Sequence, residues 1–122
     1  MWNAVGWFEI YVEDMERARG FYEAVFQVKL EKLPVPDIEM LNFPIDDEGK
    51  GSSGALVRMP GLKPGVGGTL VYFTSQDCSV EESRVEQAGG RIERPRMSIG
   101  PYGFISLVYD TEGNMIGIHS QK

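Results

Sequence analysis

A carboxylate and an imidazole are the two side chains in this sequence best suited to moving a proton. Glu9 lies in an aromatic and β-branched run typical of a strand, and His119, the only histidine, lies in another such run. If burial and proximity shift both pKa values toward neutrality, the pair can act as base and acid. The structural alternatives are polar strand-end residues that simply reach solvent, a lone histidine with a structural role, and a buried ion pair of Glu9 with Arg58.

Aromatic side chains offer a second kind of chemistry, the binding of a flat or apolar molecule. Trp7 and Tyr11 share one face of the first strand, and Phe73 lies in a second strand of similar composition. Tyr102 lies in the loop Ile99–Gly103, whose proline and glycines suit the mouth of a cavity. We predict that these four residues line a ligand cavity, although Trp7 and Phe73 suit core filling equally well.

Other motifs with known chemistry are incomplete. The glycines of 65–68 lack the Lys and Ser/Thr of a phosphate-binding loop, and no serine stands in a Gly-x-Ser-x-Gly elbow. The acidic turn that begins at Asp46 lacks the alternating spacing of a calcium loop, so we interpret it as a solvated turn. Cys78 has no basic neighbour in the sequence to lower its pKa, and we interpret it as a core residue.

The elements that must position these residues occur twice in the sequence. Asp14 is a good N-cap for a helix over 15–26, and a second helix over 77–88 begins at Asp77 and would end at Gly89-Gly90. One strand precedes each helix and three follow it. The expected strands cover 7–12, 28–33, 38–45 and 55–59, and then 69–75, 91–97, 104–109 and 115–120.

This repetition predicts an α+β fold made of two βαβββ modules in a single domain. Module one would cover about 1–60 and module two about 68–122, joined by a glycine- and proline-rich linker over about 61–67. Any active cavity would then lie between the two copies.

Length and charge exclude several classes of function. The 122 residues suffice for one domain, and the net charge of −6 with scattered Lys and Arg argues against nucleic acid and anionic membrane surfaces. No segment resembles a signal peptide, and no apolar run approaches the ~18 residues that span a bilayer. Because the single cysteine excludes an internal disulfide, we predict a cytoplasmic protein.

Three stretches of the sequence carry a family resemblance. They are Val12-Glu13-Asp14-Met15-Glu16-Arg17-Ala18 with Phe21-Tyr22, Val85-Glu86-Gln87-Ala88-Gly89-Gly90, and Asp110-Thr111-Glu112-Gly113-Asn114-Met115-Ile116-Gly117. In this order they resemble the vicinal oxygen chelate superfamily, which includes glyoxalase I, extradiol dioxygenases and bleomycin-resistance proteins. The resemblance spans nearly the whole chain. It implies two βαβββ modules whose strands form a curled, barrel-like mixed sheet around a cavity, and a homodimer.

The resemblance also implies four metal-ligand positions on the first and last strands of the modules, where family enzymes place His, Glu or Gln. Counted along the matching stretches, these positions fall on Trp7, within Ser53 to Leu56, on or beside Val71, and on Gly117. None of them offers a histidine or a carboxylate, which divalent metals would need here. We therefore predict no metal ion and no cofactor.

Glu9 and His119 share strand faces with the first and fourth of these positions, so the resemblance implies that both point toward the cavity. A two-residue shift that recruited them as metal ligands would supply two ligands rather than four. The leading hypothesis is a metal-free protein of the glyoxalase/bleomycin-resistance type that binds an apolar or aromatic ligand in the sheet cavity. The second is a metal-free lyase or isomerase that uses Glu9 and His119. The third is a metal-dependent glyoxalase or dioxygenase with ligands outside the expected positions.

Overall fold

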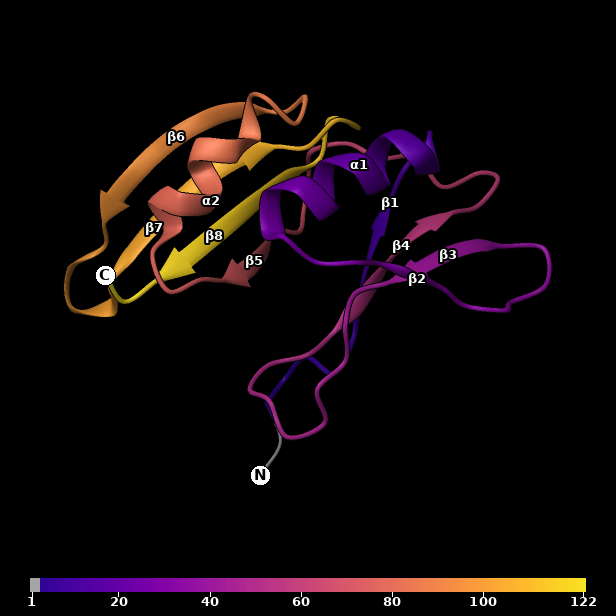
Figure 1. Ribbon diagram of the computed structural model, residues 1–122, viewed down its shortest axis with the longest axis horizontal. Helices are drawn as coiled ribbons and strands as arrows, with labels where there is room; N and C mark the ends of the chain where they lie inside the picture. The colour runs from indigo at the N-terminus through magenta and orange to yellow at the C-terminus, as the bar shows by residue number, and fades with distance from the viewer. Residues whose placement is uncertain (1–2) are drawn as a thin grey trace.

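The structure is a computed structural model that describes residues 3–122, and its elements follow one order twice (Figure 1). Module one contains β1 (Phe8–Tyr11), α1 (Met15–Phe26), β2 (Glu31–Lys32), β3 (Glu39–Asn42) and β4 (Gly54–Arg58). Module two contains β5 (Val71–Thr74), α2 (Cys78–Val85), β6 (Arg91–Ser98), the 3₁₀ turn η1 (Gly100–Tyr102), β7 (Phe104–Tyr109) and β8 (Met115–Ser120). The predicted α+β fold of two βαβββ modules is confirmed.

Each module forms one four-stranded mixed sheet with the same topology. Sheet A has the strand order β1-β4-β3-β2, and sheet B has the order β5-β8-β7-β6. In each sheet the first and last strands of the module run parallel and the other pairs are antiparallel. Over residues 3–122 no hydrogen-bonded ladder joins the two sheets, so they curl together without closing a barrel.

The first helix has the bounds that the sequence predicts. The Asp14 side chain accepts a hydrogen bond from the backbone N–H of Arg17 at 3.0 Å, which caps the helix N-terminus. Met15, Ala18 and the later members of the same stripe are buried, as a 3.6-residue repeat requires. The helix ends where Gln27 adopts a left-handed conformation with φ 55°.

The second helix is shorter than predicted, because its last regular residue is Val85 rather than Ala88. Asp77 caps its start by accepting from the backbone N–H of Ser79 at 3.0 Å. Gly89 adopts φ 98°, and the N–H of Gly90 then returns to the carbonyl of Val85 at 2.9 Å. The strands β2 and β3 are also shorter than expected.

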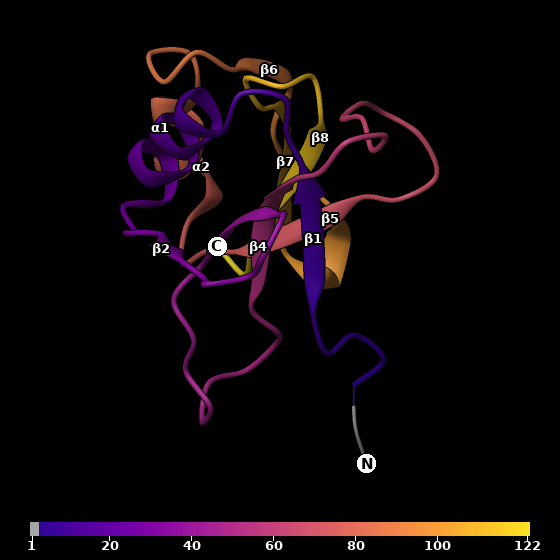
Figure 2. The same cartoon turned by 90° about the vertical axis from the view of Figure 1, so that its right-hand side faces the viewer.

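The core lies between the helices and the sheets, with α1 and α2 on the same side of the strands (Figure 2). Tyr22 of α1 is fully buried and donates its hydroxyl to Asp110 of module two at 2.7 Å. Burial first, and then the charge of Asp110, raises the pKa of Tyr22 well above 10. Glu112, two residues farther on, reaches the N-terminus of α1. The two modules therefore share one core.

None of the helices within residues 3–122 combines the length and the apolar character needed to cross a membrane.

Candidate functional site

Glu9 lies at the centre of a small polar group on one face of sheet A. Glu9 and Tyr11 alternate with the buried Ile10 along β1, and Trp7 immediately precedes the strand in the same alternation, so the three share the face opposite α1. The Glu9 carboxylate accepts from the Tyr11 hydroxyl at 3.0 Å and from Nε1 of Trp7 at 3.4 Å. The hydrogen bond to Glu9 is the main cause that raises the pKa of Tyr11. Glu9 itself is exposed to solvent.

Arg58 does not pair with Glu9. Its guanidinium lies 3.2 Å from the carboxylate of Glu39 and donates to the backbone carbonyl of Glu13 at 2.9 Å. The alternative of a buried Glu9–Arg58 ion pair is therefore wrong.

His119 is held in sheet B by the loop that carries Tyr102. Its Nε2 lies 2.7 Å from the backbone carbonyl of Tyr102. Because a carbonyl oxygen can only accept, the hydrogen bond assigns a proton to Nε2 and leaves the lone pair of a neutral imidazole on Nδ1. The half-buried His119 can thus act as a base through Nδ1.

The predicted pair is divided between the two sheets. Glu9 lies in β1 of sheet A and His119 in β8 of sheet B. Across residues 3–122, no hydrogen bond or ion pair joins them directly. Tyr102 contributes its carbonyl to His119, while its side chain is 71% exposed.

Phe73 belongs to a group of phenylalanines where the two modules meet. Its ring stacks on Phe26 of α1 with centroids 4.3 Å apart and meets Phe8 of β1 edge-on at 5.7 Å. Phe43 adds a third contact at 5.5 Å. Phe8, Phe26 and Phe43 were not among the predicted ligand residues. The sequence pattern assigns Phe8 and Phe26 to apolar stripes and places Phe43 only in the loosely alternating strand over 38–45.

This cluster opens into a pocket of about 270 Å³ between the modules, which we call the seam pocket. Its lining residues are Phe8, Phe26, Val28, Phe43, Pro44, Ser52, Ser53, Phe73, Thr74 and Glu81. An aromatic wall with a few polar groups at its edge is the usual composition of a small-molecule site.

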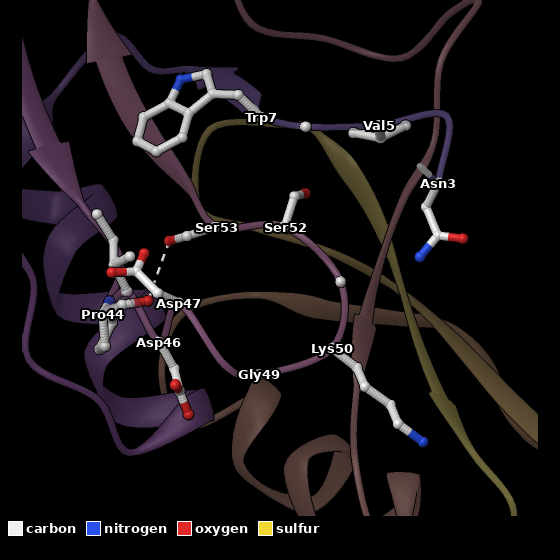
Figure 3. A pocket seen from close by; sticks show the side chains of 13 residues that line it. Asn3, Val5, Trp7, Pro44, Asp46, Asp47, Gly49, Lys50, Ser52 and Ser53 are labelled. Atoms are coloured by element: carbon white, nitrogen blue, oxygen red, sulfur yellow. Dashed lines mark hydrogen bonds between the residues drawn. The ribbon is translucent and has the colours of Figure 1, made fainter. Parts of the chain in front are cut away.

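A second pocket of about 500 Å³ adjoins the seam pocket, and the two share Pro44, Ser52 and Ser53 (Figure 3). It lies between the segment that precedes β1 and the turn that leads into β4. Trp7 forms one side, with 40% of its surface exposed, and the acidic turn with Asp46 and Asp47 forms the other. The sequence predicts only a turn here, because no pattern within these residues indicates that they line a pocket.

The residues at the four positions implied for a metal do not fit one. The parallel ladder begins at Phe8↔Gly54. Just before it, the first position offers the indole of Trp7, and the second position, within Ser53 to Leu56, offers at most the hydroxyl of Ser53. In sheet B, Tyr72 is the partner of Gly117, which replaces the other two with a phenol and no side chain. Within residues 3–122, no three His, Cys, Asp or Glu side chains come together in a way that could hold a metal ion. The donor set lacks the nitrogen and carboxylate ligands that a divalent ion needs.

Comparison with known proteins identifies a family and a shared fold. A family model for the Glyoxalase/Bleomycin resistance protein/Dioxygenase superfamily matches residues 4–118. Glyoxalase I from Zea mays superposes with a TM-score of 0.72 at 22% identity, over 94% of this chain and 45% of that one. This chain thus spans about half the length of the maize protein.

Two neighbours of similar length cover nearly the whole fold. A glyoxalase/bleomycin resistance protein from Albidiferax ferrireducens T118 has a TM-score of 0.72 at 16% identity, over 98% of this chain and 100% of its own. TnmS3, an antibiotic binding protein from Streptomyces sp. CB03234, has a TM-score of 0.69 at 23% identity, over 98% of this chain and 97% of its own. At these identities the likeness shows the fold alone. The comparison with curated proteins found no match.

Proposed function

Because this chain belongs to the Glyoxalase/Bleomycin resistance protein/Dioxygenase superfamily, we propose that it binds a small apolar or aromatic molecule without a metal ion. The observation that carries this proposal is the seam pocket, where four phenylalanines surround an opening between the modules. Aromatic rings hold flat ligands by offset or edge-on contacts of the kind already present between Phe8 and Phe73. An antibiotic binding protein with the same fold is a precedent for this use.

The adjoining pocket extends the proposed site toward polar groups. Trp7 and the acidic turn surround about 500 Å³ next to the seam pocket, so a ligand with one aromatic end and one polar end can occupy both. Of the predicted lining residues, Phe73 and Trp7 belong to these two pockets. Tyr11 holds Glu9 beside Trp7, and Tyr102 holds His119 through its carbonyl.

The experiment is a titration with planar two- and three-ring aromatic compounds, read by isothermal titration calorimetry. We expect at least one compound to bind, and Phe73→Leu to weaken its affinity about fivefold, since one aromatic contact is worth about 1 kcal/mol. Phe104→Leu is the matched control, because Phe104 packs against the same core but does not line the seam pocket. The proposal fails if no compound binds, or if both substitutions weaken binding equally.

The second candidate function is a metal-free lyase or isomerase that uses Glu9 and His119. The observation in its favour is the distance of 2.7 Å between Nε2 of His119 and the Tyr102 carbonyl, a contact that leaves Nδ1 as the nitrogen able to take a proton. If this function holds, Glu9→Gln and His119→Ala abolish turnover of a bound compound. If the protein only binds the compound, the same substitutions change the affinity, and the wild-type protein shows no turnover.

We also propose a homodimer in the cytoplasm. Figure 2 shows both helices on the same side of the strands, so the opposite sheet faces are covered by no helix of the described chain. Tyr72 exposes 46% of its surface, and a second copy can cover it. The buried, free thiol of Cys78 suits a reducing compartment. Sedimentation equilibrium tests the dimer, because a single species of 13.6 kDa would contradict it.

A further inference from the structure

Tyr72 and Gly117 form a cross-strand pair in which the ring of one residue occupies the side-chain space of the other. They are register partners in the parallel pair β5–β8, so both face away from α2. A Cβ atom built on Gly117 would lie 2.3 Å from both Cδ1 and Cε1 of the Tyr72 ring. Carbon atoms in contact normally lie about 3.5–4.0 Å apart. Any side chain at position 117 would therefore have to displace the ring.

The pair lies at one of the positions implied for a metal ligand. Gly117 is where the superfamily resemblance implies the fourth metal ligand, a residue that in family enzymes is usually Glu. Tyr72, whose ring covers Gly117, exposes 46% of its surface, so the surface at this point is that of a phenol. His119, the only histidine in the sequence, has its Nε2 2.7 Å from the Tyr102 carbonyl.

We propose that Tyr72 closes this position to metal ions, because its ring fills the space in which the fold family holds a metal ligand. The inference deepens the proposed metal-free binding function and rests on it. Its basis is space as well as donor type, because the ring and a carboxylate side chain at position 117 exclude each other. A side chain introduced at position 117 therefore has to displace the Tyr72 ring before it can reach a metal ion.

The test is a cycle of four proteins: wild type, Gly117→Glu, Tyr72→His and the double variant. Gly117→Glu should lower Tm by about 5–15 °C, the usual range for overpacking in a domain of this size. The double variant should recover at least half of that loss, because the smaller imidazole frees the space. It should also bind Ni²⁺ at least tenfold more tightly than wild type or either single variant, since it has both an imidazole and a carboxylate. Gly20→Glu is the control, because nothing lies within 4 Å of a Cβ at that helix position.

Three results would overturn the proposal. One is wild-type protein that retains close to one equivalent of Ni²⁺ or Zn²⁺ after desalting, measured by plasma mass spectrometry. Another is a Gly117→Glu variant with the wild-type Tm. The third is a double variant that is no more stable than the sum of its single changes, or that does not fold. Failure of the proposed binding function shows separately in the seam-pocket titrations, whose substitutions do not involve residue 72 or 117.

Discussion

The carboxylate of Glu112 lies 2.7 Å from Nε of Arg17, so an ion pair joins a turn of module two to the first turn of α1 in module one. Oε1 of the same carboxylate accepts the backbone N–H groups of Glu13 at 3.0 Å and of Asp14 at 2.9 Å. The side chain of Glu112 has no exposed surface, so protein groups take the place of water around it. The N-terminus of α1 is thus capped partly by the other module.

Replacing Glu112 by glutamine should destabilise the whole protein. The amide loses the charge-assisted hydrogen bonds to Arg17 and the backbone, and its NH₂ group cannot accept the N–H donors. We expect the free energy of unfolding to fall by about 2 kcal/mol and Tm by roughly 8 °C, measured by urea and thermal denaturation. Glu16→Gln is the control, because that carboxylate is 80% exposed in the same helix and should matter by less than about 0.5 kcal/mol. Equal effects of the two substitutions would contradict this account.

The contribution of Glu112 should disappear in acid. Burial raises its pKa, but the hydrogen bonds from Arg17 and from the backbone of Asp14 and Glu13 outweigh burial and lower the pKa from 4.5 to about 2. A carboxyl with a lowered pKa stabilises the fold above its unfolded pKa, and this stability is lost as the pH falls toward the folded pKa. The difference in unfolding free energy between wild type and Glu112→Gln should therefore be constant above pH 5 and shrink between pH 4.5 and 2. Urea titrations at several pH values measure this difference. A difference that did not change with pH would show that the Glu112 carboxylate is not its source.

Two glycine-to-alanine substitutions should change the free energy of unfolding in opposite directions. Gly20 lies on the exposed side of α1 with nothing within 4 Å of an added Cβ, so alanine should stabilise the protein by about 0.5–1 kcal/mol. A Cβ on Gly90 would lie 2.4 Å from the carbonyl oxygen of Tyr109 and 2.5 Å from Cε1 of Phe21. There alanine should destabilise by about 1–3 kcal/mol. Denaturant midpoints give both values, and a stabilised Gly90→Ala variant would mean that module two packs differently.

Glu9→Gln should lower the pKa of Tyr11. The Glu9 carboxylate favours the protonated phenol through its hydrogen bond and its charge, and glutamine keeps the shape but removes the charge. The change can be followed by NMR of ¹³C-labelled tyrosine, with Tyr72 as the reference because Glu9 hydrogen-bonds Tyr11 and not Tyr72. A Tyr11 pKa that did not move would show that the two side chains do not meet in solution.

Local chemistry explains which parts of the fold could be predicted. The bounds of α1 follow from Asp14, which caps the helix, and from a buried stripe at helical spacing, and both can be read within a dozen residues. The doubled order of elements follows from the same kind of local pattern. The second helix ends early because Gly89 and Gly90 turn the chain back to Val85. The sequence shows that the helix must stop at these glycines, but it does not show how many residues the turn before them takes up.

Contacts between distant residues explain what could not be predicted. Phe8 and Phe26 have the spacing of core residues. They line a pocket because the fold brings them into contact with Phe73, which is distant in the sequence. Glu112 has the sequence signature of a turn, and no local pattern connects it with Arg17. The missing metal ligands were visible in the sequence, but the ring that fills the space at Gly117 was not.

The cap that Glu112 provides has a consequence for how the chain is made. Glu112 is 98 residues from Asp14, so a ribosome that adds about 5–20 residues per second delivers the carboxylate roughly 5–20 seconds after the helix start that it completes. During that interval Glu13 and Asp14 have to leave their N–H groups to water. The nascent first module should therefore stay loose and open to chaperones and proteases, and reach its final stability only when the second module arrives.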